Sequence, residues 1–174
     1  MSNNSKIYTS ADFFSENYRL SCTIDARKNS LGDILYDMTT SYLMVDDAYV
    51  SPIDRPSQIL IDSPSAMIIK DSLTFALTSD KNTVFRRDQK YGQYYAPSLH
   101  EVILTLPFFE ISGDLHMPGR VTPEILITSK TEGFITLLDV TAKVVSNPDI
   151  TYQGEACIVS KNKISFVGLM DNYS

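Results

Sequence analysis

The strongest constraint on the fold is a pattern of residues that occurs twice in this chain of 174 residues. Residues 18–80 contain apolar segments of the kind that form strands and one short helical segment. Residues 108–171 contain a similar series. Similar residue types recur at a spacing of 91 positions, and Phe75 with Phe166 is one such pair. Any single match could be chance, but the order of the matches favours an internal duplication.

Local patterns within the first series predict strand, helix and strand. Residues 18–25 alternate between apolar and polar side chains, which is typical of a half-buried strand. Ser30 and Asp33 have the spacing of a helix capping box. Residues 42–50 predict the next strand. Four apolar residues after the cap have helical spacing and predict one buried helix face: Leu31, Ile34, Leu35 and Met38.

The second series predicts a helix start at the matching place with different residues. Thr122 can cap a helix, Pro123 suits the first helical position, and Glu124 favours the positive end of the helix dipole. We therefore predict a mainly β (β-rich α+β) fold with two similar repeats, each with one short helix. The repeats form either β-barrel-like units or an open sheet, and they bury their apolar faces against each other or against another subunit.

This pattern divides the chain into five segments. Residues 18–80 and 108–171 are the two β-rich repeats, and residues 81–107 connect them through a basic and aromatic stretch followed by a strand. Residues 1–17 form an N-terminal lead-in, and residues 172–174 form a tail.

Composition restricts the compartment and the partners. The net charge of −6 argues against a general nucleic-acid binder, because contact with phosphates requires a basic surface. The first six residues lack the apolar core of a signal peptide, and the apolar run 102–109 is too short to span a bilayer. Together with only two cysteines, these features predict a cytoplasmic protein with reduced thiols and no membrane partner.

Motifs for catalysis or metal binding are missing from the sequence. We find no glycine-rich phosphate loop and no nucleophile elbow, and His100 and His116 have no neighbours at metal-ligand spacing. Cys22 and Cys157 lie among apolar residues and are predicted to be small buried side chains. We therefore predict a protein that is not an enzyme and that has no catalytic residues, no metal and no cofactor.

The acidic residues near the second strand need a separate interpretation. Asp46 and Asp47 are adjacent, and an aspartate recurs at Asp139 in the second series. Neighbouring residues on a strand point to opposite faces, so the pair cannot share a proton. We interpret the recurring aspartate as a residue that ends or bends the strand.

The best candidate for a binding site lies in the connector. Residues 81–107 carry four basic and two acidic residues, and they are the only region with a positive net charge. Arginine binds phosphates and carboxylates, and tyrosine adds rigid contact area. The alternative interpretation is a solvated connector whose charges maintain solubility. The candidate binding residues are Arg86, Arg87, Lys90, Tyr91, Tyr94 and Tyr95.

One resemblance to a known class of domain supports the architecture. The series Ser30-Leu-Gly-Asp-Ile-Leu35 followed by Tyr42-Leu-Met-Val-Asp-Asp-Ala-Tyr-Val50 resembles small bacterial β-rich domains of unknown function. Those domains carry an Arg-Leu-Ser-Asp-x-Leu-Asn stretch followed by a Phe-Leu-x-Leu-x-Asp-Val strand. Gly32 replaces the serine and Tyr36 the asparagine. The resemblance implies an architecture and no activity.

Two functions remain open from the sequence. The first is a non-enzymatic protein-interaction or assembly scaffold, whose partner is another protein or a second copy of the chain. The second is a regulatory module that senses a small ligand or anion in the cleft between the repeats and at residues 86–95.

Overall fold

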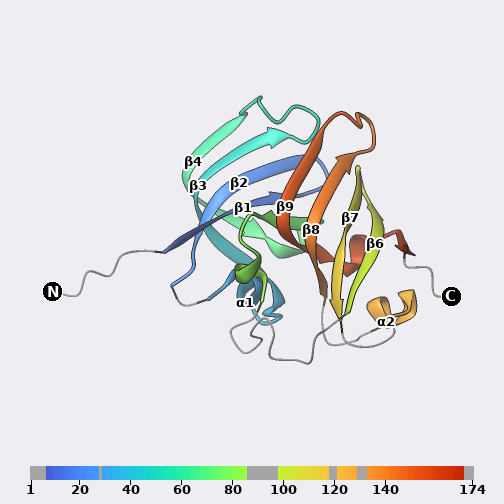
Figure 1. Ribbon diagram of the computed structural model, residues 1–174. Helices are drawn as coiled ribbons and strands as arrows, with labels where there is room; N and C mark the ends of the chain where they lie inside the picture. The colour runs from blue at the N-terminus through green and yellow to red at the C-terminus, as the bar shows by residue number, and fades with distance from the viewer. Residues whose placement is uncertain (1–6, 28, 86–97, 118–120, 129–132, 171–174) are drawn as a thin grey trace.

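The computed structural model describes residues 7–27, 29–85, 98–117, 121–128 and 133–170. Its described strands form one antiparallel sheet of ten strands in the order β10-β6-β7-β8-β9-β5-β1-β2-β3-β4 (Figure 1). The strands are β1 (Tyr8–Phe14), β2 (Tyr18–Asp25), β3 (Tyr42–Pro52), β4 (Ile61–Ile69), β5 (Phe75–Thr78), β6 (Ser98–Leu106), β7 (Phe109–Met117), β8 (Phe134–Val144), β9 (Thr151–Ser160) and β10 (Phe166–Leu169). The helices are α1 (Leu31–Tyr36) and α2 (Pro123–Thr128), with 3-10 turns η1 (Lys70–Ser72), η2 (Lys81–Val84) and η3 (Lys161–Lys163).

The predicted mainly β class with two short helices is confirmed, and the sheet is open. The order strand, strand, helix, strand, strand, 3-10 turn, strand occurs in β1–β5, here called the first half, and in β6–β10, the second half. Strand β1 lies within the predicted lead-in, and β6 lies within the predicted connector. The origin of this order by duplication stays a prediction.

The N-terminus of α1 forms as its sequence predicts. Ser30 Oγ accepts a hydrogen bond from the backbone N–H of Asp33 at 3.0 Å, and Asp33 Oδ2 accepts one from the N–H of Ser30 at 2.9 Å. Leu31 and Leu35 are fully buried. The prediction is wrong for Met38, which is 71% exposed because the helix ends at Tyr36 and the chain then becomes extended.

A β-bulge occurs at the same place in both halves. Asp47 has a φ of 48° and Asp139 has a φ of 50°. The pairing of β3 with β2 shifts register beside Asp47, and the pairing of β8 with β7 shifts beside Asp139. Both strands continue beyond the aspartate, so this residue bends the strand and does not end it.

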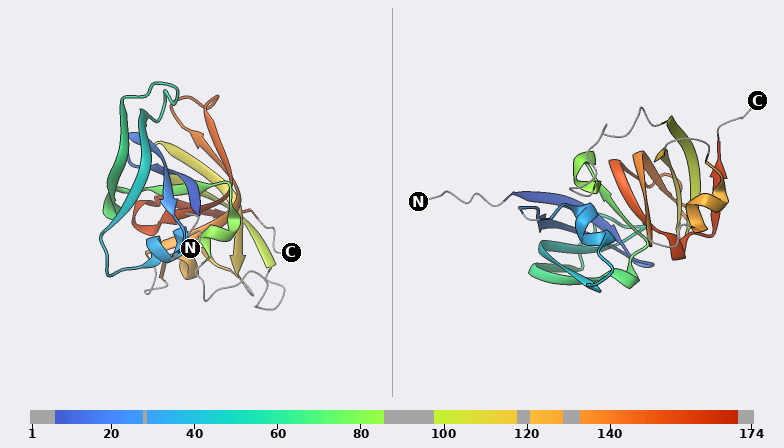
Figure 2. Two further views of the ribbon diagram at one scale, coloured as in Figure 1. Left: turned by 90° about the vertical axis from the view of Figure 1, so that its left-hand side faces the viewer. Right: turned by 90° about the horizontal axis from the view of Figure 1, so that it is seen from below.

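The pairing of β5 with β9, here called the junction, joins the two halves. Phe75 and Val159 are paired and belong to one apolar core, whereas the adjacent pair Ala76 and Ile158 belongs to the other. Adjacent pairs point to opposite faces of a sheet, so the two cores lie on opposite faces of the junction strands. Each half therefore curls around its own core, and the halves lie side by side (Figure 2).

Each core is completed by side chains from the other half. The core of the first half contains Phe134 and Ile158, which come from β8 and β9. The core of the second half contains Phe14 and Phe75, whose rings are stacked with centroids 4.4 Å apart. Neither half therefore buries its apolar residues alone.

Candidate interaction surface

The structure leaves a cluster of apolar side chains exposed on the outer face of β3 and β4. Tyr42 pairs with Ile69, and Met44 pairs with Met67, so the four side chains share one face of the sheet. Their exposed fractions are 43%, 50%, 56% and 53%, in that order. Contiguous exposed apolar groups are uncommon on monomeric proteins and mark interaction sites more often than scattered ones do. This cluster of Tyr42, Met44, Met67 and Ile69 is called the β4 patch below.

The β4 patch lies beside an open edge of the sheet. Among the described strands, β4 pairs only with β3. The N–H of Lys70 points to the β3 side, where it donates to the carbonyl of Ser41 at 2.9 Å. Because backbone groups alternate in direction along a strand, the N–H and C=O groups of Ile69, Met67 and Ser65 point outward. The patch therefore combines apolar side chains with backbone groups that can pair with another strand.

The opposite edge of the sheet also exposes apolar side chains. Strand β10 pairs only with β6 among the described strands, and Phe166 on β10 is 57% exposed. Helix α2 contacts β10, and its Ile125 and Ile127 are 45% and 44% exposed. Figure 1 places β4 and α2 on opposite sides of the molecule. Strand β10 and α2 together are called the β10 end.

The candidate binding residues Arg86, Arg87, Lys90, Tyr91, Tyr94 and Tyr95 all lie outside the described residues. The described chain stops at Phe85, whose ring centroid is 6.2 Å from that of His116, and it resumes at Ser98 in β6. The Phe85 carbonyl accepts a hydrogen bond from Ser30 Oγ at 2.8 Å. The anion-binding role of residues 86–95 stays a prediction.

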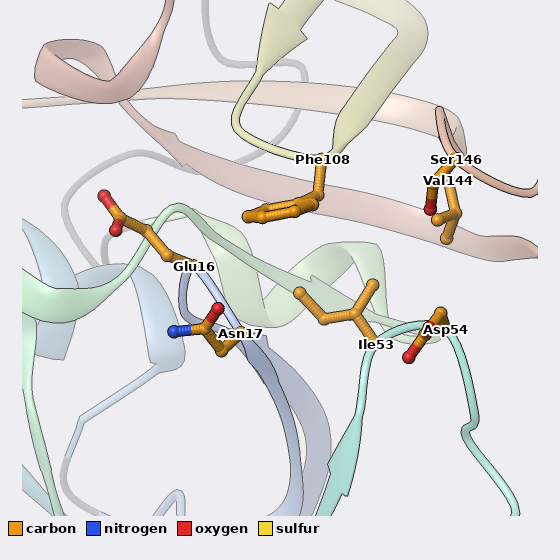
Figure 3. Close-up of a pocket in the computed structure, with 7 residues that line it drawn as sticks. All are labelled: Glu16, Asn17, Ile53, Asp54, Phe108, Val144 and Ser146. Atoms are coloured by element: carbon orange, nitrogen blue, oxygen red, sulfur yellow. The ribbon is translucent and has the colours of Figure 1, made fainter.

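A pocket of about 140 Å³ lies between the two halves (Figure 3). The described residues of its lining include Phe108 and two carboxylates, Glu16 and Asp54, and no lysine or arginine. Its lining residues are Glu16, Asn17, Ile53, Asp54, Phe108, Val144 and Ser146. Each carboxylate forms an ion pair with a basic side chain, Glu16 with Lys163 at 3.4 Å and Asp54 with Arg55 at 3.6 Å, so these two cations are already engaged. Phe108 follows the C-terminal end of β6, and Ser98 starts this strand, so the pocket lies roughly 25–30 Å from Ser98, at about 3.4 Å per residue.

The two cysteines are buried and unreactive. Cys22 is 4% exposed and Cys157 is fully buried. Burial raises the pKa of the Cys22 thiol to about 12, and it raises the pKa of Cys157 as well. Both thiols stay protonated at neutral pH and are poor nucleophiles. The prediction that they are small buried side chains is confirmed.

The described residues contain no group of three or more His, Cys, Asp or Glu side chains that could hold a metal ion. Within the same part of the chain, no helix has the length and apolar character that crossing a membrane requires. No known protein family, curated protein or solved structure matches the chain.

The sequence predicted residues 42–50, which include the β3 part of the β4 patch, as a strand, but it did not predict the patch itself. Residues 42–45 and 66–69 are apolar at every position, so they have no polar outer face. Such unbroken apolar runs are typical of strands that are covered on both faces. In this structure the inner residues Leu43 and Ile68 are buried, and the outer ones are exposed. These two unbroken apolar runs were the feature of the sequence that indicated a second covered face.

Proposed function

We propose that this protein is a non-enzymatic interaction or assembly scaffold, built from a duplicated β-rich unit, that binds a protein partner through the β4 patch. The observation that carries the proposal is the contiguity of Tyr42, Met44, Met67 and Ile69 beside an open strand edge. A partner strand that pairs with β4 gains main-chain hydrogen bonds and covers the apolar side chains together, which is the mode of β-augmentation.

A comparison of the free energy of apolar burial with the cost of association indicates that binding at the patch also needs hydrogen bonds from the strand edge. Full burial of one apolar side chain contributes about 1.5–3 kcal/mol, and the four side chains are already about half buried. The patch alone therefore supplies roughly 3–6 kcal/mol, which is comparable to the cost of about 4–15 kcal/mol for association. We therefore expect the partner to pair with the edge of β4 and not merely to cover its face.

Photo-crosslinking in cells that express the protein tests this proposal. A photoreactive residue in place of Met44 is expected to give a defined crosslinked product, and the peptides in that product identify the partner. The same residue in place of Val145 is the matched control, because Val145 is 59% exposed and lies outside the patch.

When Met67→Lys is combined with the photoreactive residue at position 44, the crosslinked product is expected to disappear, because a charge on the patch opposes burial of the patch. Equal products from Met44 and Val145, or a product that persists in the Met67→Lys variant, contradict the proposal. Loss of folding is excluded by an unchanged circular dichroism spectrum, which we expect because the Met67 side chain is 53% exposed.

A further inference from the structure

The junction inside the chain provides a template for the two open edges. At the junction β5 pairs with β9 through residues 75–78 and 156–159. Strand β10 has the place of β5 in the second half, and β4 has the place of β9 in the first half. Phe166 follows Phe75 by 91 positions, and Val159 follows Ile68 by the same number. The open edges of β4 and β10 are therefore the counterparts of the edges of β9 and β5, which pair with each other at the junction.

Several side chains that are buried at the junction have counterparts at the open edges that are exposed. Ile158 on β9 is fully buried, whereas its counterpart Met67 on β4 is 53% exposed. Phe75 on β5 is fully buried, whereas its counterpart Phe166 on β10 is 57% exposed. Three further positions follow the same rule: Phe134 is buried and Tyr42 exposed, Ser160 is buried and Ile69 exposed, and Ala156 is buried and Ser65 exposed.

One contact shows what covers this face at the junction. Tyr36 at the end of α1 shares a hydrogen bond of 2.7 Å between its hydroxyl and the Oγ1 of Thr136 on β8. Its ring also lies edge-on to Phe134 at 6.1 Å. Strand β8 begins one residue later in its half than β3 does, so Thr136 corresponds to Met44 in the β4 patch at a spacing of 92 positions, and α1 corresponds to α2 at the β10 end. The helix at the β10 end is therefore placed to cover the β4 patch of another molecule.

Backbone geometry at the open edges matches that of the junction strands. The Lys161 N–H donates to the Gly133 carbonyl at 2.9 Å, as the Lys70 N–H does to the Ser41 carbonyl. The Ser165 N–H donates to the Thr105 carbonyl at 2.9 Å. This bond has its counterpart at 2.8 Å between Thr74 and Phe14. Both open strands therefore leave the same outward groups that the junction strands use for pairing.

We propose that β10 of one copy of the chain pairs antiparallel with β4 of a second copy and so repeats the junction between molecules. The inference rests on the proposed function and identifies the partner as the same protein. The template fixes the register as Phe166 with Ile68, Val167 with Met67, Gly168 with Ala66 and Leu169 with Ser65. Pro64, which has no N–H to donate, falls just outside this register, as its counterpart Glu155 does at the junction.

This contact is heterologous, because each molecule uses a different edge toward each neighbour. The two edges lie on opposite sides of the molecule (Figure 1), so a second copy bound at β4 leaves its own β4 open. Heterologous contacts build rings where the rotation closes and filaments where it does not. The proposal therefore predicts oligomers whose size rises with concentration.

Disulfide trapping tests the register directly. Two single variants, Met67→Cys and Val167→Cys, are purified separately, mixed and oxidised. Residues opposite each other on antiparallel strands have Cα atoms about 4.5–5.5 Å apart, which lies within the range of a disulfide. In the mixture we expect a crosslinked dimer, and this dimer contains one chain of each variant. The native Cys22 and Cys157 are buried and do not compete.

A matched mixture of Met67→Cys with Leu169→Cys is the register control, because diagonal partners lie about 7–8 Å apart and should crosslink far less. Light scattering over a concentration series provides a second measurement. The unmodified protein is expected to form oligomers, and Met67→Lys is expected to be a monomer, while Val145→Lys behaves as the unmodified protein.

Three results would overturn this inference. One is a monomer at every concentration that gives no crosslink, which leaves the proposed function intact if Met44 still crosslinks to another protein. Another is a disulfide in Met67→Cys alone, which indicates symmetric pairing of two β4 strands. The last is equal crosslinking at positions 167 and 169. If neither oligomers nor any product from Met44 is found, the proposed function fails as well.

Discussion

At the scale of single residues, the two bulge aspartates show how one backbone position can set the course of a strand. Asp47 and Asp139 have φ values of 48° and 50°. Most residues avoid this left-handed region because Cβ approaches the carbonyl oxygen, and aspartate tolerates it better than branched residues do. The recurrence of aspartate is therefore explained by the backbone and needs no acid–base or metal chemistry.

Substitutions at Asp47 are expected to follow backbone strain. Asp47→Gly should leave the free energy of unfolding within about 0.5 kcal/mol of the original value, because glycine adopts positive φ readily. Asp47→Val should lower it by about 1–2 kcal/mol, because a branched side chain is strained there. Urea denaturation measures both changes. Asp46→Val, at a neighbouring residue without positive φ, is the control, and equal losses at both positions would contradict this explanation.

At the scale of elements, α1 is held by contacts with segments far away in sequence. The Leu31 N–H donates to Thr83 Oγ1 at 3.1 Å, which connects the helix start to η2. At the helix end, Lys70 Nζ donates to the carbonyls of Ile34 at 2.5 Å and Asp37 at 2.8 Å. A helix of six residues is not stable alone, so these contacts and the buried leucines maintain it.

Gly32 is expected to be the most sensitive position of α1. A Cβ atom at Gly32 would overlap the backbone carbonyl of Val84, so the helix and η2 would have to separate. We expect Gly32→Ala to lower the free energy of unfolding by about 1–3 kcal/mol, the usual cost of overpacking. Gly133→Ala is the matched control, since its Cβ would meet only the Met38 side chain at 3.9 Å. Thermal denaturation of both variants measures the difference, and a stable Gly32→Ala protein would refute the close contact.

At the scale of the whole molecule, an aromatic cluster joins the two halves. Phe75 stacks on Phe14 at 4.4 Å, and its ring lies edge-on to Phe109 of the second half at 4.9 Å. Tyr152 of the second half donates a hydrogen bond from its hydroxyl to the carbonyl of Ile53 in the first half at 2.8 Å. Because the two cores share residues across the junction, we expect the halves to unfold together.

Phe75→Ala and Phe166→Ala form a matched pair that tests this cooperativity. Removing the fully buried Phe75 should cost about 3–5 kcal/mol and should still give a single unfolding transition. Phe166→Ala, at the exposed counterpart, should leave the stability of dilute protein nearly unchanged and weaken self-association. Calorimetry and hydrogen exchange measure these effects. Two separate transitions in the Phe75→Ala protein would be expected only if the halves folded independently.

The sequence by itself determined the local features of this protein. Alternation in residues 18–25, the capping box of Ser30 and Asp33, and the apolar surroundings of Cys22 and Cys157 depend on near neighbours, and the structure confirms each of them. Met38 was the exception, because helical spacing alone does not show where a helix ends.

Only the tertiary structure decided which apolar faces are covered. Met67 and Ile158 occupy matching places on β4 and β9, and both lie in apolar runs, yet one is exposed and the other fully buried. The difference arises because β9 pairs with β5 and its Ile158 belongs to the core of the first half, which includes residues of α1, whereas β4 has no second strand neighbour among the described residues. Burial depends on segments distant in the chain, and a local pattern contains no information about which of two similar strands obtains that neighbour.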